Sequence, residues 1–584
     1  MMERLHASDI AARVNDGLST ALDVAEDALA RIATYDRVQP QAWISRFADD
    51  AIRAAARAID ARIAAGERLP LAGVPFAVKD NIDVAGLETT AACPAFAYAP
   101  AAHGFVVQRL IDAGALCIGK TNLDQFATGL NGSRSPHGAP RTVFNLGYVS
   151  GGSSSGSAVV TAAGLVAFAL GTDTAGSGRV PAAFNHLIGY KPSKGRWSNS
   201  GLVPACRSLD CITVFTDRSA DAALVDRVVA GFDPADAYSR ALPDRPLGSR
   251  IGVPLPHQRH FCGDGQSEHL YAQALAKLQA MGHELVEIDL APLSEAAALL
   301  YSGPWVAERT AAMADMLRDH PDAIDPTVRQ IVEVGLGVTA VDLFRGQYRL
   351  AELARVAEMI WQRVDMLALP TAPTTYRVKE MQAAPIALNA NLGLYTNFVN
   401  LLDMAAMAVP AGFRRNATGF GITFIAPAGT DAALFVMASR WEQAGHYTTP
   451  ELDLEGSMET VRLAVVGAHL KDMPLHWQLT SRDAVFVAAT TTAPSYRLYA
   501  MANSTPPKPA LIHDDSGAAI AVEVYELSAE AFGSFTAEVP APLAIGTVTL
   551  ADGSSVKGFV AEPRAIIGAE DITALGGWRA YIAR

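Results

Sequence analysis

Residues Gly151 to Ser177 read GGSSSGSAVVTAAGLVAFALGTDTAGS, and the rest of the chain is organised around them. The stretch opens with a Gly/Ser-rich turn, continues through an uncharged apolar segment, and ends on a second serine flanked by glycines. A Gly/Ser-rich run is usually a flexible linker, because its side chains bury almost nothing. Here the run leads into a segment that should be buried, where glycines allow a positive φ or a close backbone approach to a ligand. We therefore expect an active site in which the fold brings Ser153 and Ser177 together.

The composition is that of a globular protein with ample material for a core. Of the 584 residues, 50% are hydrophobic and 18% are charged, and the 47 basic and 60 acidic residues give a formal net charge of −13. At about 100–200 residues per domain, the chain can hold several domains. The acidic balance argues against a nucleic-acid-binding protein, which needs a basic surface.

The sequence indicates no disulfide framework, metal site or cofactor. The five cysteines are odd in number and show no CxxC spacing, which fits a reducing compartment. The longest uncharged apolar run, about 158–170, is shorter than the roughly 20 residues that span a bilayer. The N-terminus lacks the apolar core of a signal peptide. We therefore expect a cytoplasmic protein that binds neither nucleic acid nor membrane and carries no cofactor or metal.

Hydrophobic periodicity predicts two domains of different character. Helix-like spacing at 18–36 and 51–66 and short apolar strands at 73–80 and 115–121 begin an alternation that is typical of an α/β layered architecture. Further strands and helices are predicted up to a closing helix at 431–445. After a polar seam, the chain changes to short strands and predicts a separate β-rich domain, with strands expected at 462–470, 484–492, 496–501, 509–515, 519–527, 547–553 and 554–562.

Lys79 ends one of the predicted strands, in GVPFAVKD. A lysine at a strand end is often a surface residue. However, the continuous apolar run before it is typical of a strand buried on both faces, and burial lowers the pKa of an ammonium group so that it can act as a base. The chain offers no histidine with a supporting acid pattern, so a Ser–Lys mechanism is more natural than a Ser–His–Asp triad.

The DTAGS turn supplies consecutive backbone N–H groups just before Ser177, and such a turn can hold a developing oxyanion. Asp173 and Arg179 flank this serine. An exposed ion pair would contribute little, but these two residues bracket a segment that should be buried. We therefore expect them to hold the shape of the turn.

At these residues the sequence resembles the amidase signature family. GGSSSGS followed by GTDTAGSGRVPAA matches the central motif of that family, and GVPFAVKD matches the strand that bears its catalytic lysine. The resemblance implies an α/β/α layered mixed sheet with surrounding helices over residues 1–446. It also implies that Ser177 is the nucleophile, that Ser153 carries protons and follows a cis peptide bond, and that Lys79 is the general base. The implied oxyanion hole is formed by the backbone N–H groups of Thr174, Ala175, Gly176 and Ser177.

Within that family the sequence is similar to the allophanate hydrolases. The segment TNLDQFATGLNGSRSPHGAPR at 121–141 matches the one that lines their acyl pocket and contains Gly129. Tyr301 and Arg309 match the pair that holds the substrate carboxylate, a task that suits the guanidinium fork of arginine. Without the resemblance, these two residues are simply eight positions apart on a predicted helix, on one face that could equally cover solvent.

Residues 461–584, after an expected linker at 447–460, resemble the additional domain of allophanate hydrolases, with a small β-rich α+β fold like that of γ-glutamyl cyclotransferases. Val466 stands where that fold has the tyrosine of its Tyr-Gly-x-Leu loop, which argues against cyclotransferase activity itself. The resemblance implies that this domain helps to decarboxylate N-carboxycarbamate, with His469 and Glu523 as candidate residues. The alternative is a domain that only packs and assists assembly, with His469 on a surface loop.

The resemblance implies hydrolysis of allophanate, or urea-1-carboxylate, in the degradation of urea or of triazines and cyanurate. It also implies a homodimer. No biotin carrier motif is visible in the sequence, so we expect the chain to work with a separate biotin-dependent urea carboxylase. The alternatives are another small-carboxylate or general amidase, such as a malonamidase, the glutaminase component of a transfer-RNA-dependent complex, and a non-catalytic binding protein. The acidic charge and the second domain argue against the glutaminase component.

Overall fold

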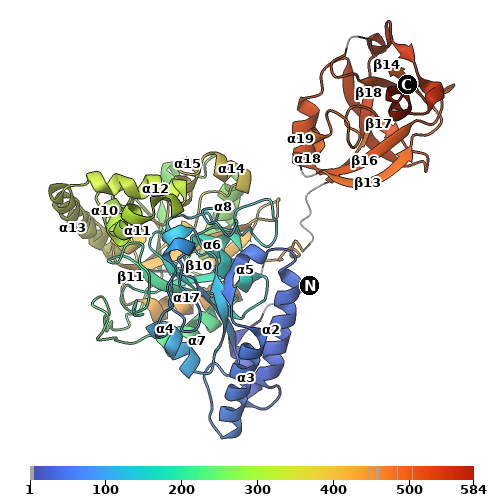
Figure 1. Ribbon diagram of the computed structural model, residues 1–584. Helices are drawn as coiled ribbons and strands as arrows, with labels where there is room; N and C mark the ends of the chain where they lie inside the picture. Colours follow the sequence, from blue (N-terminus) through green and yellow to red (C-terminus); the bar gives the residue numbers. More distant parts are fainter. Residues whose placement is uncertain (1–4, 446, 455–459, 483, 503) are drawn as a thin grey trace. The chain divides into compact units, whose positions relative to one another are not determined.

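The computed structural model describes residues 5–445, 447–454, 460–482, 484–502 and 504–584. The chain divides into two compact units, Met1–Gly456 and Ser457–Arg584, which are shown in Figure 1. Within the expected linker at 447–460, residues 455–459 lie outside the described residues.

A mixed sheet of eleven strands runs through the first unit, with helices around it (Figure 1). Three adjacent strands near one edge of the sheet pair in parallel, whereas most of the neighbours beyond them pair antiparallel. The predicted α/β mixed sheet is therefore confirmed. In spatial order, the strands are β1 (Trp43–Arg46), β3 (Leu116–Thr121), β2 (Pro75–Lys79), β4 (Phe168–Asp173), β6 (Cys211–Thr216), β5 (Ile188–Lys191), β10 (Met404–Phe413), β11 (Gly419–Pro427), β9 (Met366–Pro370), β7 (Arg250–Pro254) and β8 (Glu284–Ile288).

The helices include the two predicted near the N-terminus, at 18–36 and 51–66, which form α2 and α3. Thr20 and Asp23 make a capping box that starts α2, because each side chain satisfies a backbone N–H that the helix leaves free. The α-helices of the first unit are α1 (Ala7–Asn15), α2 (Ala21–Tyr35), α3 (Asp49–Ala64), α4 (Phe105–Asp112), α5 (Ser155–Ala162), α6 (Val180–Phe184), α7 (Ser219–Val229), α8 (Gly265–Ala280), α9 (Ala291–Ala298), α10 (Trp305–Ala312), α11 (Ala314–Asp319), α12 (Pro326–Glu333), α13 (Ala340–Arg363), α14 (Val378–Ala383), α15 (Ala387–Leu392), α16 (Phe398–Leu401) and α17 (Asp431–Gln443).

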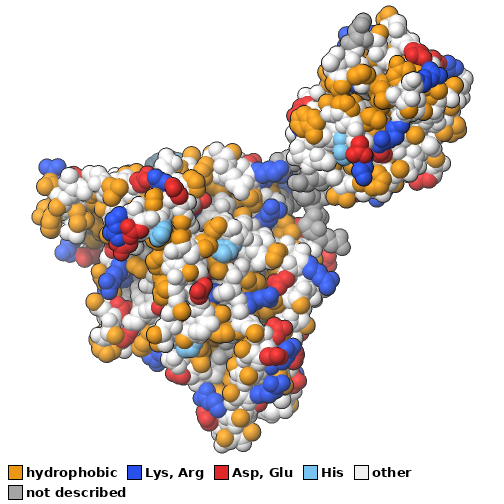
Figure 2. Space-filling model, in the orientation of Figure 1, with side chains coloured by type: hydrophobic (Ala, Val, Ile, Leu, Met, Phe, Trp, Pro, Cys, Tyr) orange, Lys and Arg blue, Asp and Glu red, His pale blue; other side chains and the backbone are white. Residues whose placement is uncertain are grey.

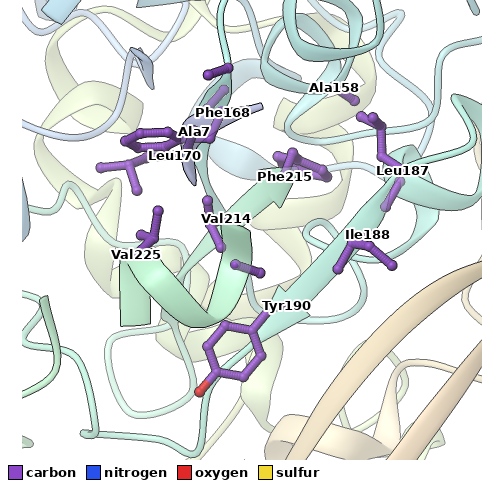
Figure 3. Close-up of a cluster of buried hydrophobic side chains, with 14 of the residues drawn as sticks. Ala7, Ala158, Phe168, Leu170, Leu187, Ile188, Tyr190, Val214, Phe215 and Val225 are labelled. Atoms are coloured by element: carbon purple, nitrogen blue, oxygen red, sulfur yellow. The ribbon is translucent and has the colours of Figure 1, made fainter. Parts of the chain in front are cut away.

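The core of the first unit is centred on β2, β4 and β6, in which every residue is buried. Figure 3 shows Phe168 and Leu170 of β4 close to Val214 and Phe215 of β6. The ring of Phe168 also stacks on Phe76 of β2, with centroids 5.3 Å apart and planes 12° from parallel. Because both faces of these strands are covered, their sequences are continuous apolar runs. This packing fixes the ends of β2 and β4, where the candidate catalytic residues lie.

The second unit contains a five-stranded and a three-stranded sheet with a core of its own. All seven strands predicted for this region are present as β12–β18, whereas β19 and three short helices were not predicted. The elements are β12 (Thr460–Val465), α18 (Trp477–Thr480), β13 (Val485–Thr491), β14 (Tyr496–Ala500), β15 (Pro509–His513), β16 (Ala521–Ser528), α19 (Ala529–Ala537), β17 (Leu543–Thr549), β18 (Ser555–Ala561), β19 (Glu570–Asp571) and α20 (Trp578–Ile582).

The surface carries both signs of charge. On the face shown in Figure 2, basic and acidic side chains lie in small interspersed groups, with no continuous basic tract. Among the helices that the structure describes, none is long and apolar enough to cross a membrane.

The stacked aromatic pair in the core generates a stability prediction. Phe168→Ala should lower the free energy of unfolding of the first unit by about 3–5 kcal/mol, because it leaves a cavity between β2, β4 and β6. The matched control is Phe344→Ala on α13, where the ring is exposed and the change should stay within about 0.5 kcal/mol. Urea unfolding followed by tryptophan fluorescence measures both. Equal effects of the two substitutions would contradict this account of the core.

Candidate active site

Lys79 lies at the end of β2 with no exposed surface. Its Nζ is 2.7 Å from Ser153 Oγ and 2.6 Å from Thr172 Oγ1. Burial lowers the pKa of Lys79 to about 7, against the opposing pull of Asp124 and of two further carboxylates. The lysine therefore exchanges its proton in the range where a general base is useful.

Thr172 is a partner of the lysine that sequence reasoning missed, although its motif was recognised. Strands β2 and β4 are parallel, and Val78 pairs with Leu170. Lys79, which follows Val78, and Thr172, two residues after Leu170, therefore come together at the same edge of the sheet. Parallel pairing of the two apolar runs was the signal that could have found this contact.

Ser153 lies in the turn before α5, and the peptide bond between Gly152 and Ser153 is cis, as the resemblance implies. The glycines of this turn are required by close packing. A Cβ atom at Gly152 would lie 2.2 Å from Asp124 Oδ2 and 2.5 Å from the backbone nitrogen of Gly132. The whole of 151–160 is buried, so the Gly/Ser run is part of the core of the site and not a linker.

Asp173 and Arg179 form a fully buried ion pair around the turn that follows β4. Arg179 Nε donates to Asp173 Oδ2 at 2.8 Å, and Nη2 donates to Oδ1 at 3.0 Å. Burial alone would raise the pKa of Asp173, but Arg179 outweighs it, and the pKa falls below its usual value. The carboxylate also accepts the backbone N–H groups of Gly176 and Gly178 at 2.9 and 3.1 Å. The expectation that this pair holds the turn is confirmed.

One of the four predicted oxyanion donors is already engaged. The N–H of Gly176 points to Asp173, so it is not available to an oxyanion in this conformation. Over the ranges that the structure describes, the N–H groups of Thr174, Ala175 and Ser177 have no hydrogen-bond acceptor. The candidate oxyanion hole therefore narrows to these three groups.

Ser177 is buried and faces the loop that contains Gly129. Its Oγ donates to the carbonyl oxygen of Gly129 at 3.4 Å. Asp124 holds this loop, because its Oδ2 accepts the N–H groups of Asn131 and Gly132 and its Oδ1 accepts that of Arg134. Sequence reasoning quoted Asp124 within a motif without giving it a role, since only the folded loop shows which N–H groups its carboxylate serves.

Arg309 lies on α10 with a buried side chain, so it does not cover solvent. Its Nη1 donates to Thr128 Oγ1 at 3.1 Å and its Nη2 donates to Tyr301 Oη at 3.3 Å. Tyr301 lies in the turn before α10, so the assumption that both residues share one helix is wrong. Among the described residues, the buried Nε of Arg309 has no hydrogen-bond partner, and Asp210 and Glu308 act on the guanidinium only through longer-range attraction. A buried cation in this state is suited to an anionic ligand.

In the second unit, Glu523 lies on β16, opposite Val465 of β12. Its carboxylate accepts the backbone N–H of Lys471 at 2.7 Å, the hydroxyl of Tyr525 at 3.0 Å and Arg579 Nη2 at 2.9 Å. Burial raises the pKa of Glu523, but these donors outweigh it and lower the pKa overall. The carboxylate is therefore ionised near neutral pH.

His469 lies on the loop after β12 and is packed among aromatic rings, unlike an ordinary surface-loop histidine. Its ring stacks on Phe559 at 5.0 Å and meets the edge of Phe535 at 5.1 Å. Its Nε2 is 2.7 Å from Gln478 Oε1. Burial lowers the pKa of His469, so the ring is neutral near pH 7. The structure brings His469 and Glu523 to the same end of the β12–β16 pair, each with its own partners.

No group of three or more His, Cys, Asp or Glu side chains that could hold a metal ion occurs in the part of the chain that the structure describes. The side chains of Lys79, Ser153 and Ser177 are an amine and two hydroxyl groups, which can pass protons between them. Their arrangement suits acyl transfer to a serine.

Two family models match the chain. The model described as Amidase matches residues 23–435, and the model described as Allophanate hydrolase C-terminal domain matches residues 461–583.

The chain is similar to curated and solved proteins over most of its length. It is 44% identical over 547 residues to a urea amidolyase of Saccharomyces cerevisiae. The matched region covers 88% of this chain and 30% of that protein. The chain thus spans about a third of the length of the curated urea amidolyases that it matches. It is 35% identical over 469 residues to one component of the glutamyl-tRNA(Gln) amidotransferase of Prochlorococcus marinus, covering 74% of this chain and 96% of that protein. A solved structure of Kluyveromyces lactis allophanate hydrolase matches with 40% identity, 97% coverage of each chain and a TM-score of 0.69.

The burial of Lys79 predicts a pH dependence of stability. Its pKa is about 7 in the folded chain and about 10.4 when unfolded, so between pH 7 and 10 the unfolded state binds more protons. The free energy of unfolding should therefore gain up to about 1.4 kcal/mol per pH unit from this group as the pH rises through that window. Urea unfolding from pH 7 to 9.5 should show a smaller rise for Lys79→Met than for the unsubstituted chain. Identical slopes would mean that the buried lysine stays charged.

Proposed function

The chain belongs to the amidase family, and from that premise we propose that it hydrolyses allophanate, releasing ammonia and, after decarboxylation, carbon dioxide. The observation that carries this proposal is the environment of Arg309. Its guanidinium is buried and contacts Thr128, the residue before Gly129, and the carbonyl of Gly129 accepts the Ser177 hydroxyl. A cation and a candidate nucleophile therefore meet the same short loop. This arrangement suits a small substrate with an amide at one end and a carboxylate at the other.

The proposed relay runs from Ser177 through Ser153 to Lys79. The uncharged amine of Lys79 accepts a proton from Ser153, and Ser153 accepts one from Ser177. Rotation of the Ser177 hydroxyl from the Gly129 carbonyl toward Ser153 starts this transfer. Thr172 also contacts the amine and keeps it at the end of β2. The pKa of Lys79, near 7, makes this base effective near neutrality.

In the first chemical step, Ser177 Oγ attacks the carbonyl carbon of the terminal amide of allophanate. The N–H groups of Thr174, Ala175 and Ser177 hold the oxyanion. The C–N bond then breaks, and the proton taken up by the relay leaves with ammonia. Water hydrolyses the remaining ester. In total, allophanate and water give N-carboxycarbamate and an ammonium ion.

We further propose that the second unit promotes the loss of carbon dioxide from N-carboxycarbamate. The family match over residues 461–583 supports a role specific to allophanate hydrolases. Glu523 and His469 are the candidate residues, one ionised and one neutral near pH 7. Packing and assembly remain the alternative role for this unit.

Allophanate is the product of carboxylating urea, so we propose that the chain acts after a biotin-dependent urea carboxylase. The occurrence of matching sequence within urea amidolyases supports this pairing. The homodimer and the cytoplasmic location stay predictions. A second candidate substrate is another small carboxylated amide such as malonamate, because Arg309 binds a carboxylate whatever atom joins it to the amide.

Substitution of Ser177 and Arg309 tests the proposed reaction. Ser177→Ala should abolish ammonia release from allophanate. Arg309→Ala should lower kcat/KM for allophanate by at least about 30-fold, since a charge-assisted contact to the substrate is lost, while hydrolysis of a small neutral amide is unaffected. Arg329→Ala, at a half-exposed arginine of α12 that pairs with Asp322 and Glu333, is the matched control. Unchanged allophanate turnover in Arg309→Ala would point to a different amide substrate.

The role of the second unit can be tested in the full chain with His469→Ala and Glu523→Gln. Ammonia and carbon dioxide released from allophanate are measured together in the first minutes of reaction. If the unit promotes decarboxylation, these variants should release the first ammonia at the normal rate with less carbon dioxide than the unsubstituted chain. His513→Ala, an exposed histidine of the same unit, should keep the normal ratio. Normal ratios in all three variants would favour a packing role.

A further inference from the structure

A short turn, Ala205–Asp210, touches both ends of the proposed substrate site without belonging to the proposed relay. It lies just before β6. Its own backbone is closed by the N–H groups of Leu209 and Asp210, which both donate to the carbonyl of Cys206 at 2.9 Å. We call this segment the spacer turn.

At one end, the spacer turn holds Thr174, the first residue of the candidate oxyanion hole. Asp210 Oδ1 accepts the hydroxyl of Thr174. Its Oδ2 accepts the N–H groups of Ala205 and Cys206 at 2.8 and 3.1 Å. All of these donors are neutral. Burial raises the pKa of Asp210 to about 6, so the carboxylate is still mostly ionised at neutral pH.

At the other end, the spacer turn holds the helix that carries Arg309. Ser208 donates twice to the carboxylate of Glu308, from its backbone nitrogen at 2.7 Å and from its hydroxyl at 2.8 Å. Glu308 immediately precedes Arg309 on α10. The position of the Arg309 guanidinium is therefore tied to the spacer turn through one residue, Glu308.

The space between the two ends is filled with apolar side chains. Cys206 and Leu209 of the spacer turn belong to one buried cluster with Ala175 of the oxyanion turn and Trp305 of α10. Tyr301, the hydroxyl partner of Arg309, packs against the same cluster. Close-packed interiors transmit displacement rather than absorb it, so the two ends cannot move apart independently.

We propose that the spacer turn fixes the distance between the oxyanion donors at Thr174 and Ala175 and the guanidinium of Arg309, and thereby selects substrates by the separation of their amide and carboxylate. This inference rests on the proposed function, because it takes Arg309 to be the carboxylate partner. Allophanate and malonamate place one atom between the amide carbonyl and the carboxylate, whereas succinamate places two. Ser208 and Asp210 are positioning residues in this proposal, since neither contacts the reacting atoms.

The test compares allophanate, malonamate and succinamate as substrates of the unsubstituted chain and of Ser208→Ala and Glu308→Ala. One methylene is typically discriminated by about 10- to 200-fold in kcat/KM. In Glu308→Ala, which releases α10 from the spacer turn, the preference for malonamate over succinamate should fall by about tenfold, through a higher KM for malonamate with little change in kcat. Ser208→Ala keeps the backbone N–H bond to Glu308 and should give a smaller fall in the same direction. Ser208→Thr keeps both donors and should restore the preference.

The chain offers a closely matched control. Ser219 also donates its backbone N–H and its hydroxyl to one carboxylate, that of Glu442, at the start of α7. Ser219→Ala removes the same kind of bond outside the site and should leave the preference for chain length unchanged. Thermal unfolding of each variant shows whether the fold is retained.

An equal loss of kcat/KM for all three substrates, or an unchanged preference in Ser208→Ala and Glu308→Ala, would overturn the spacer role. The same would follow if Ser219→Ala altered the preference as much as Ser208→Ala. The proposed function is judged separately, by whether the unsubstituted chain releases ammonia from allophanate. If it does not but hydrolyses malonamate, the function fails while the length preference still tests the spacer turn.

Discussion

The arrangement of the candidate site depends on excluding water from one amine, that of Lys79. The proposed role of Lys79 as a base near neutrality depends on its burial, because it has no exposed surface and desolvation disfavours its charged form. That condition explains the continuous apolar run of β2 before it, in which Phe76 stacks on Phe168. It also explains why the partners of the amine are hydroxyl groups, Ser153 and Thr172, since a directly paired carboxylate would stabilise the ammonium form.

The carboxylates around this amine have other tasks. Asp124 binds the N–H groups of its own loop, Asp173 pairs with Arg179, and Asp210 binds neutral donors of the spacer turn. Each raises the pKa of Lys79 from a distance, and none contacts its Nζ. Their combined pull partly offsets desolvation, so the pKa settles near 7 instead of falling further. The residues that shape the loops therefore also set the strength of the base.

Sequence reasoning placed strands and motifs well where they depend on neighbouring residues, and the Lys79–Ser153 contact that it led us to expect is present. Lys79, Ser153 and Ser177 stand in continuous motifs, and β2 and β4 are apolar runs whose burial could be predicted. It failed where a contact joins distant segments. Thr172 meets Lys79 only through the parallel register of two strands. The loss of the Gly176 N–H to Asp173 depends on how the turn closes, and the turn at Tyr301 interrupts what spacing alone predicts as one helix.

The spacer turn shows how one fold can separate reactivity from selectivity. The proposed relay involves the end of β2, the turn before α5 that carries Ser153, and the turn after β4 that carries Ser177. Arg309, the proposed carboxylate partner, lies on α10, far along the chain, and is held by its bond to Thr128 and by the Ser208–Glu308 bonds. A change in the packing of Ser208 on Glu308 would move Arg309, whereas the Lys79 amine is held by its own contacts with Ser153 and Thr172. The contacts of the proposed base and the position of Arg309 are thus set largely by different hydrogen bonds, and Asp210, which binds Thr174 and acts on Lys79 from a distance, links the two.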